Sequence, residues 1–135
     1  MRIGKGRSIG IEAGADTRKR LDWALGKAHV AGGMLYASSV GPVSPESGRL
    51  VSDSIKLQAK QCMANLKTLL EANGTSLDKI VWANWALRDA SEFEDFGEEW
   101  VRWFEGEPPV GQGTMMPPND RRSGFRVSLG VIAEV

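Results

Sequence analysis

The residues most able to do chemistry lie near the end of the chain, in the stretch GEPPVGQGTMMPPND at positions 106–120. Every side chain of its central PPVGQGTMM run is uncharged, and the run has the pattern of a short strand between two proline pairs. Gln112 and Thr114 are two residues apart, so both would face one way on a strand. They could hydrogen-bond a polar ligand or form a satisfied strand pair. Gly111 and Gly113 favour a close backbone approach, either to a ligand or to a neighbouring subunit.

Charged groups that could act together with this strand follow it in the sequence. Arg126 lies four residues before Gly130, so the two would share a face of one strand. Its guanidinium could bind an anion, form an interface ion pair or mark a solvated strand end. Glu134 alternates onto the same face, where a carboxylate could orient water for attack on a C=N bond, although its terminal position favours solvation. Arg121 and Arg122 could close over an anion, but a solvated turn is the more ordinary interpretation.

Metal, thiol and triad chemistry have little support in this sequence. Cys62 falls on the apolar stripe of a predicted helix, which favours a buried, inert thiol. His29 falls in an early strand, where a structural role is the more ordinary one, and Asp89 is a further acid or base candidate. With one cysteine and one histidine, the chain does not favour a Cys/His metal cluster or a Ser-His-Asp triad. Neither glycine-rich nucleotide motif occurs, so we expect no metal and no cofactor.

The composition is typical of one globular domain. At 135 residues, with 41% hydrophobic and 25% charged residues, the chain can bury one core. We assign residues 1–135 to a single domain, with residues 1–20 as a loose arm. Seventeen basic residues balance seventeen acidic ones, which argues against a nucleic-acid or anionic-membrane surface. No apolar run approaches the ~18 residues that span a bilayer, and none follows the basic start as in a signal peptide. We expect a soluble, cytoplasmic protein.

Two amphipathic helices are predicted. Between residues 53 and 73, apolar residues recur at steps of three and four. Ser52 or Asp53 is the predicted N-cap, and Gly74 can take the left-handed conformation that ends the helix. The second helix is predicted to begin with a capping box formed by Ser91 and Glu94. The aromatic residues on its predicted face are Phe93, Phe96, Trp100 and Phe104.

Strands are predicted where β-branched and aromatic residues cluster or alternate with polar ones. The glycines at 32 and 33 indicate a hairpin. Trp82 and Trp85 lie three apart, so one should enter the core and the other should meet the opposite face of the sheet. The predicted strands cover residues of about 9–11, 27–31, 34–40, 79–89, 110–116 and 124–135. The order β-β-β-α-β-α-β-β predicts an α+β domain with two helices on one face of a mixed sheet.

Three segments together resemble the YjgF/Rid family, the reactive intermediate deaminases formerly called endoribonuclease L-PSP. They are GGMLYASSVGPVSPESGRLV, IKLQAKQCMANLKTLLEANGTSLDKIVWANWALRD and FEDFGEEWVRWFEGEPPVGQGTM. The resemblance covers about residues 20–134 and implies the chorismate-mutase-like α+β fold. It also implies a homotrimer with ligand clefts between neighbouring subunits. The enzymes of the family hydrolyse reactive enamines or imines, such as 2-aminoacrylate, to ketones and ammonia.

The resemblance implies that several pocket residues of the family differ in this chain. The family deaminases bind the substrate carboxylate with an arginine, and the matching residue here is Gln112. Glutamine cannot form the two charge-assisted bonds of a guanidinium. The family's tyrosine and serine fall on about Leu25 and Gly26, its helix asparagine on Gly97, and the acidic residue of its last strand on Gly130. We therefore expect little 2-aminoacrylate deaminase activity.

Two hypotheses for the function follow. The first is a diverged Rid protein whose intersubunit cleft hydrolyses an enamine or imine; the alternative is a trimer of the same fold that binds a small metabolite without turnover. A ribonuclease has poor support, because the net charge is zero and there is no catalytic histidine pair. The expected partner is a small molecule, for instance a carboxylate, and not nucleic acid or membrane. The predicted binding residues are Arg126, Gln112, Thr114 and, at the cleft rim, Trp23, and the catalytic candidate is Glu134.

Overall fold

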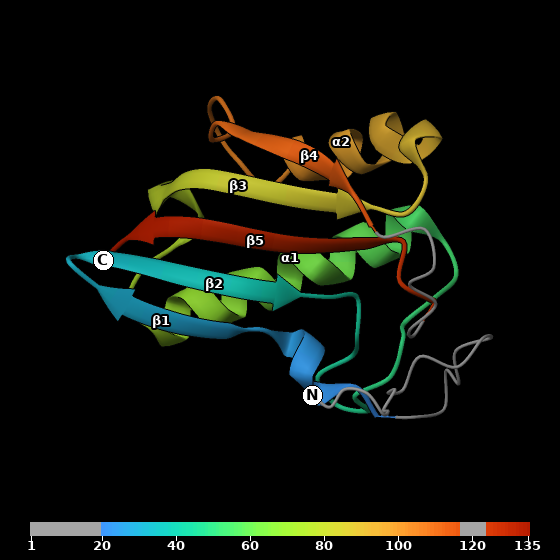
Figure 1. The fold of residues 1–135 in the computed structure, drawn as a ribbon, viewed down its shortest axis with the longest axis horizontal. Coiled ribbons are helices and arrows are strands. Elements are labelled where there is room, and N and C mark those ends of the chain that lie inside the picture. The colour runs from blue at the N-terminus through green and yellow to red at the C-terminus, as the bar shows by residue number, and fades with distance from the viewer. Residues whose placement is uncertain (1–19, 117–123) are drawn as a thin grey trace, which may run out of the picture.

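The computed structural model describes residues 20–116 and 124–135. Within them, a five-stranded sheet is covered on one face by two helices, and Figure 1 looks onto the sheet with the helices behind it. The sheet order is β1-β2-β5-β3-β4. Neighbouring strands are antiparallel except β3 and β4, which are parallel. The strands are β1 Lys27–Ala31, β2 Met34–Val40, β3 Ile80–Leu87, β4 Gly111–Met115 and β5 Val127–Glu134, and the helices are α1 Ile55–Ala72 and α2 Phe93–Val101.

The predicted α+β class, with two helices on one face of a mixed sheet, is confirmed. The described elements run β-β-α-β-α-β-β, and the further strand predicted near residues 9–11 lies outside the described residues. The first hairpin has the predicted bounds, because Gly32 and Gly33 adopt φ values of 60° and 77° that its two-residue turn requires. No helix in the described part of the chain is long and apolar enough to cross a membrane.

Helix α1 begins slightly later than predicted. Its N-cap is Ser54, whose hydroxyl oxygen accepts a hydrogen bond from the Leu57 N–H at 3.3 Å. Ser52 is not the cap, because its hydroxyl accepts from the Ser54 N–H and shapes the turn before the helix. The helix ends as predicted. Gly74 has a φ of 82°, and the N–H of Thr75 donates to the Leu70 carbonyl at 3.0 Å.

The capping box predicted for the second helix is wrong. The Asp89 carboxylate accepts from both the N–H and the hydroxyl of Ser91, at 2.9 and 2.8 Å. Ser91 is therefore held inside a short 3-10 turn, η3 Ala90–Glu92. Helix α2 follows this turn, and its N-cap, Glu92, makes no side-chain capping bond. The helix also ends at Val101, so Phe104 lies beyond it.

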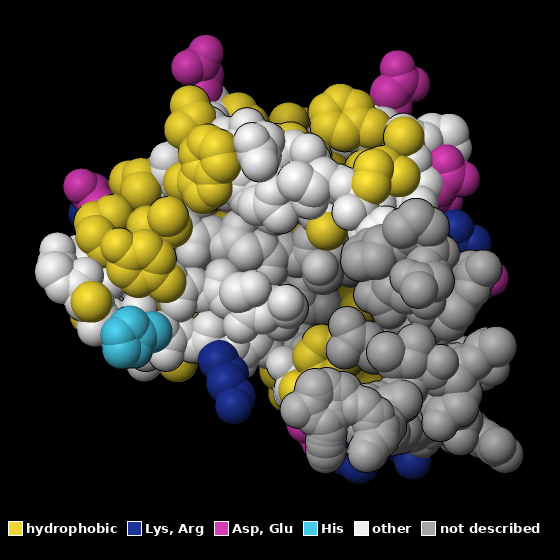
Figure 2. All heavy atoms as spheres, viewed as in Figure 1, with side chains coloured by type: hydrophobic (Ala, Val, Ile, Leu, Met, Phe, Trp, Pro, Cys, Tyr) yellow, Lys and Arg dark blue, Asp and Glu magenta, His cyan; other side chains and the backbone are white. Residues whose placement is uncertain are grey.

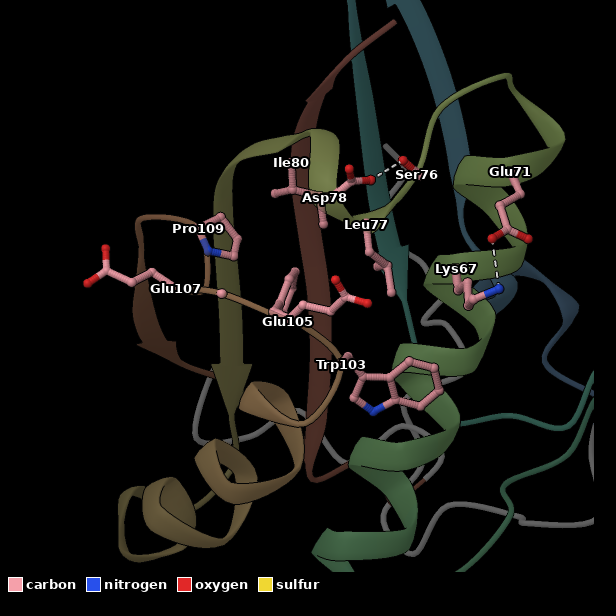
Figure 3. A pocket seen from close by; sticks show the side chains of 12 residues that line it. Lys67, Glu71, Ser76, Leu77, Asp78, Ile80, Trp103, Glu105, Glu107 and Pro109 are labelled. Atoms are coloured by element: carbon pink, nitrogen blue, oxygen red, sulfur yellow. Dashed lines mark hydrogen bonds and ion pairs between the residues drawn. The ribbon is translucent and has the colours of Figure 1, made fainter.

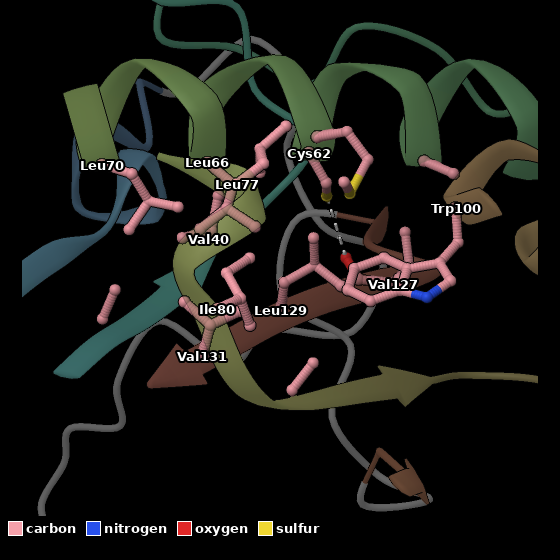
Figure 4. Packing of buried hydrophobic residues seen from close by; sticks show 14 of the residues in the cluster. Val40, Cys62, Leu66, Leu70, Leu77, Ile80, Trp100, Val127, Leu129 and Val131 are labelled. Atoms are coloured by element: carbon pink, nitrogen blue, oxygen red, sulfur yellow. Dashed lines mark hydrogen bonds between the residues drawn. The ribbon is translucent and has the colours of Figure 1, made fainter. Parts of the chain in front are cut away.

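The main core lies between α1 and the sheet (Figure 4). Cys62, Leu66 and Leu70 point from the helix toward Val127 and Leu129 of β5, and all five are buried. Each large apolar side chain buried in this way contributes roughly 1.5–3 kcal/mol to the free energy of unfolding. Burial also raises the pKa of the Cys62 thiol, in keeping with the inert thiol predicted from the helix stripe.

The two tryptophans of β3 face opposite sides of the sheet, as predicted. Trp85 packs against Phe96 and Trp100 of α2, with ring centroids 5.8 and 5.6 Å apart. A Cβ at Gly113, the partner of Trp85 on β4, would lie 2.7 Å from the indole nitrogen. The glycine is therefore required by the close approach of this indole to the edge strand. Trp82 lies on the face that carries no helix, which we call the open face.

A buried glutamine joins the start of α1 to the start of β5. The Gln58 amide nitrogen donates to the carbonyls of Ser52 and Gly124, at 2.8 and 3.1 Å. Its carbonyl oxygen accepts from the Arg126 N–H at 2.7 Å. Gln58 is fully buried, so these three bonds satisfy polar groups that would otherwise be costly to bury.

Candidate functional site

The strand register places two rows of side chains across the open face. The first row, which we call the polar row, crosses the sheet through Lys27, Ser38, Gly130, Asn84 and Gln112. Ser38 and Gly130 meet at a bulge between β2 and β5, where a Cβ on Gly130 would lie 3.6 Å from the Ser38 hydroxyl. Rows on one face are separated by two residues along each strand, about 6.8 Å.

The second row, which we call the aromatic row, lies beside the first. It consists of His29, Tyr36, Ile132 and Trp82, which are cross-strand partners in that order. Tyr36 is 46% exposed and Trp82 is 37% exposed. Figure 2 views this face, where white and yellow spheres cover the middle of the sheet and Lys, Arg and His side chains lie toward its margin. The open face therefore combines neutral polar groups with aromatic surface.

The aromatic row and the polar row from Lys27 to Asn84 line one groove of about 530 Å³, and Gln112 lies beside it. This volume is within the usual range for small-molecule sites, about 300–1,000 Å³. Gly130 forms part of its floor. A Cβ there would meet its nearest atoms, the Ala37 carbonyl oxygen and the Ser38 hydroxyl, at 3.4 and 3.6 Å, which is ordinary contact. The backbone does not need glycine at this position, and the missing side chain deepens the groove.

A second hollow, of about 440 Å³, lies on the other side of the sheet between α1 and the segment after α2 (Figure 3). Its walls include Trp103, Glu105 and Glu107, and Lys67 at its rim is paired with Glu71 at 2.7 Å. The Ser76 hydroxyl holds the pKa of the Asp78 carboxyl below its usual range. Each polar group is either paired locally or exposed, so the groove on the open face is the stronger candidate site.

Comparison with known proteins identifies the family. A family model described as endoribonuclease L-PSP matches residues 23–119. The chain belongs to this family, the YjgF/Rid proteins. It is 33% identical over 79 residues to a RutC family protein of Sulfurisphaera tokodaii, covering 58% of this chain and 63% of that protein. It is 28% identical over 80 residues to Reactive Intermediate Deaminase A, chloroplastic, of Arabidopsis thaliana, covering 59% and 43%.

Solved structures agree with this assignment. The crystal structure of the Rid-family protein YyfA from Yersinia pestis, a protein of unknown function, matches with a TM-score of 0.73 and 29% identity, covering 80% of this chain and 85% of that one. The chain spans somewhat less than two thirds of the length of the first curated relatives it matches, 63% for the Sulfurisphaera protein. The fold and family are therefore shown over the body of the domain.

Two of the predicted site residues of this Rid protein lie on the open face. Gln112 and Thr114 are exposed on β4, opposite Asn84 and Ala86 of β3. The Asn84 amide donates to the Thr114 hydroxyl at 3.4 Å, a long hydrogen bond. Both therefore lie beside the groove that Asn84 lines.

Arg126 does not share a face with Gly130, and that expectation is wrong. Strand β5 begins at Val127 and not at residue 124 as predicted. The Arg126 N–H donates to the Gln58 side chain at 2.7 Å instead of to a neighbouring strand, while its carbonyl accepts from the Arg88 N–H. The guanidinium turns to the helix layer instead. It donates to the Asp53 carbonyl at 2.7 Å and pairs with the Glu92 carboxylate at 3.3 Å. In the described structure Arg126 therefore occupies an ion pair between the two helix starts.

The other predicted site residues lie away from the groove. Glu134 lines a separate hollow beside Lys79, at the far end of β5 from Arg126. Trp23 lies in η1 Asp22–Leu25 and packs against Phe125 with the rings tilted by 35° and their centroids 5.8 Å apart. The N–H and hydroxyl of Ser91 hold the pKa of Asp89 below its usual range, which makes this carboxylate a weak base. Arg121 and Arg122 lie outside the described residues.

Sequence reasoning missed most of the groove. The sequence patterns do not single out Lys27, Ser38 or Asn84, and they favour a structural role for His29, which is exposed on the open face. The hairpin pattern was sufficient to pair Lys27 with Ser38 and His29 with Tyr36, because the turn fixes that register. No local pattern indicated that β5 would insert between β2 and β3.

Replacing Arg126 with alanine is expected to destabilise the fold. Arg126→Ala should lower the free energy of unfolding by about 1–2 kcal/mol, because it leaves the half-buried Glu92 carboxylate without its partner. The matched control is Lys56→Ala, whose exposed pair with Glu98 at 3.3 Å should contribute less than about 0.5 kcal/mol. Urea denaturation of both variants measures the difference, and equal effects would contradict this role for Arg126.

Proposed function

We propose that this Rid protein binds a small metabolite in the groove on its open face, and that neighbouring subunits of a homotrimer enclose the ligand. The observation that carries the proposal is the polar row, in which Ser38 and Asn84 flank the floor left open by Gly130. Hydroxyl and amide groups around a hollow with an aromatic margin are typical of small-molecule sites. Gln112 and Thr114 extend the polar surface along β4.

The assembly is proposed from the apolar part of the open face. Tyr36 and Trp82 are 46% and 37% exposed in the single chain, and Ile132 lies between them. A large apolar patch exposed on one face of a sheet usually marks a surface that another protein covers. A second and third copy would cover the aromatic row and leave the polar row at the subunit boundary.

A homotrimer is the expected form in solution. Sedimentation equilibrium at micromolar concentration should give three times the mass of the 14.7 kDa chain. Trp82→Glu should shift the protein toward monomers, because it places a charge in the aromatic row. Lys60→Glu, on the exposed side of α1, is the control and should leave the mass unchanged. A monomeric parent protein would refute the proposed assembly.

The groove itself is tested by filling its floor. Benzamide, a neutral planar probe, should shift the backbone amide resonances of Ser38, Asn84 and Gly130 in NMR titrations. Gly130→Val should remove these shifts while retaining the folded spectrum, because the space above Gly130 admits a side chain without close contacts. Gly97→Val is the control, because it replaces a glycine of α2 that lies away from the groove and has open space around its Cβ position. Binding by Gly130→Val equal to the parent would argue against the groove.

Hydrolysis of an enamine or imine is the second candidate function. The observation that favours it is His29, which lines the groove and whose imidazole can take up and release a proton. The reacting species is the iminium ion, which an enamine gives by protonation at carbon. Water adds to its C=N carbon and loses one proton to the imidazole, which gives a neutral carbinolamine. The imidazolium returns that proton to the carbinolamine nitrogen; the C–N bond then breaks as the hydroxyl forms C=O, and the hydroxyl proton passes to the released ammonia. Glu134 has no part in this proposal because it lines a different hollow.

Hydrolysis of 2-aminoacrylate is expected to be slow. With Gln112 in place of an arginine, the carboxylate of that substrate loses a charged contact worth ~1.5–3 kcal/mol. That corresponds to roughly ten- to hundredfold in rate. The rate of pyruvate formation from 2-aminoacrylate generated in situ measures this, with a family deaminase assayed in parallel. Equal rates for the two proteins would show that Gln112 does not limit the reaction.

A further inference from the structure

The groove on the open face contains one charged side chain among the described residues that line it. This residue is Lys27, exposed at the first position of β1. Its ammonium forms no ion pair or hydrogen bond with any residue in the described ranges. No aspartate or glutamate lines the groove either. Among the described residues that line this hollow, Lys27 therefore contributes the one unneutralised charge, and that charge is positive.

Two other cationic side chains near the sheet do not line the groove. Arg126 is held by Asp53 and Glu92 on the helix side. Lys79 lines the hollow near the end of β5, together with Glu134. Within residues 20–116 and 124–135, Lys27 is thus the cation that lies in the polar row.

We propose that Lys27 makes the groove select anionic ligands over neutral ones, and that the ligand is a small planar monoanion. This inference rests on the proposed binding function of the groove. The Lys27 ammonium and the Ser38 hydroxyl hold the anionic group, since both are hydrogen-bond donors at the same end of the polar row. The uncharged part of the ligand lies over Gly130, between Asn84 and the rings of Tyr36 and Trp82.

The spacing of the strands limits the size of this ligand. Lys27 and Asn84 are separated by three strand intervals, about 14 Å between their backbones. The groove over Gly130, of about 530 Å³, suits one ring carrying a single carboxylate, which is smaller than a nucleotide.

The test uses two probes of equal shape and different charge, benzoate and benzamide, titrated into the trimer or whatever assembly the full chain forms. Both should shift the amide resonances of Ser38, Asn84 and Gly130, and benzoate should bind about tenfold more tightly. Lys27→Met should remove this preference by weakening benzoate alone. Lys27→Arg should retain most of it, because a guanidinium also donates to a carboxylate. The control Lys60→Met removes an exposed lysine from α1 and should change neither affinity.

The outcomes separate the two proposals. If both probes bind and Lys27→Met keeps the preference for benzoate, or if the parent shows no such preference, the role of Lys27 is wrong while the groove stands. If neither probe shifts the groove resonances of the parent protein, the proposed binding function fails together with this inference. A preference that disappears in Lys27→Met and persists in Lys27→Arg and Lys60→Met supports Lys27 as the residue that selects the ligand's charge.

Discussion

The alternation of β5 is the constraint on which the rest of this structure depends. The strand lies at the centre of the sheet, with Val127, Leu129 and Val131 buried against the helix layer and Gly130 facing the other way. A slip of one residue would put Leu129 on the open face and Gly130 in the core. The apolar stripe of α1 makes that slip costly, so helix packing on one face fixes where the groove forms on the other.

Buried amides on α1 extend this control to the loops. Gln58 fixes the approach to β5 through Ser52, Gly124 and Arg126. Asn65, further along the same helix, donates to the carbonyls of Gly41 and Val43 at 3.0 and 2.8 Å. These bonds satisfy loop carbonyls that the fold buries. The same helix therefore carries the apolar stripe that orients β5 and the polar groups that place the segments leading into and out of the sheet.

The sequence predicts the bounds of those elements whose pattern depends on residues close together in the chain. The bounds of β1 and β2 and most of α1 followed from a glycine turn and an apolar stripe. The prediction for Arg126 fails because it extends strand alternation back to residue 124, whereas β5 begins at Val127 and the Arg126 N–H donates to Gln58, a residue far away in the chain. The cap of α2 failed because Asp89 competes for Ser91. The polar row could not be found because it depends on the strand order, which non-local pairing decides.

The polar row of this Rid protein carries its charge at one end only. Gln112 is neutral and lies at the β4 end of the row. Lys27 places the positive charge at the β1 end, four strand intervals or about 19 Å away. Gly130, between them, offers no acid. The two nitrogen bases among the described residues of the groove, Lys27 and His29, both come from β1, and the Tyr36 phenol lies beside them on β2. Proton transfer and anion binding in this groove would then be concentrated at one edge of the sheet, while the frame that positions them is common to the family.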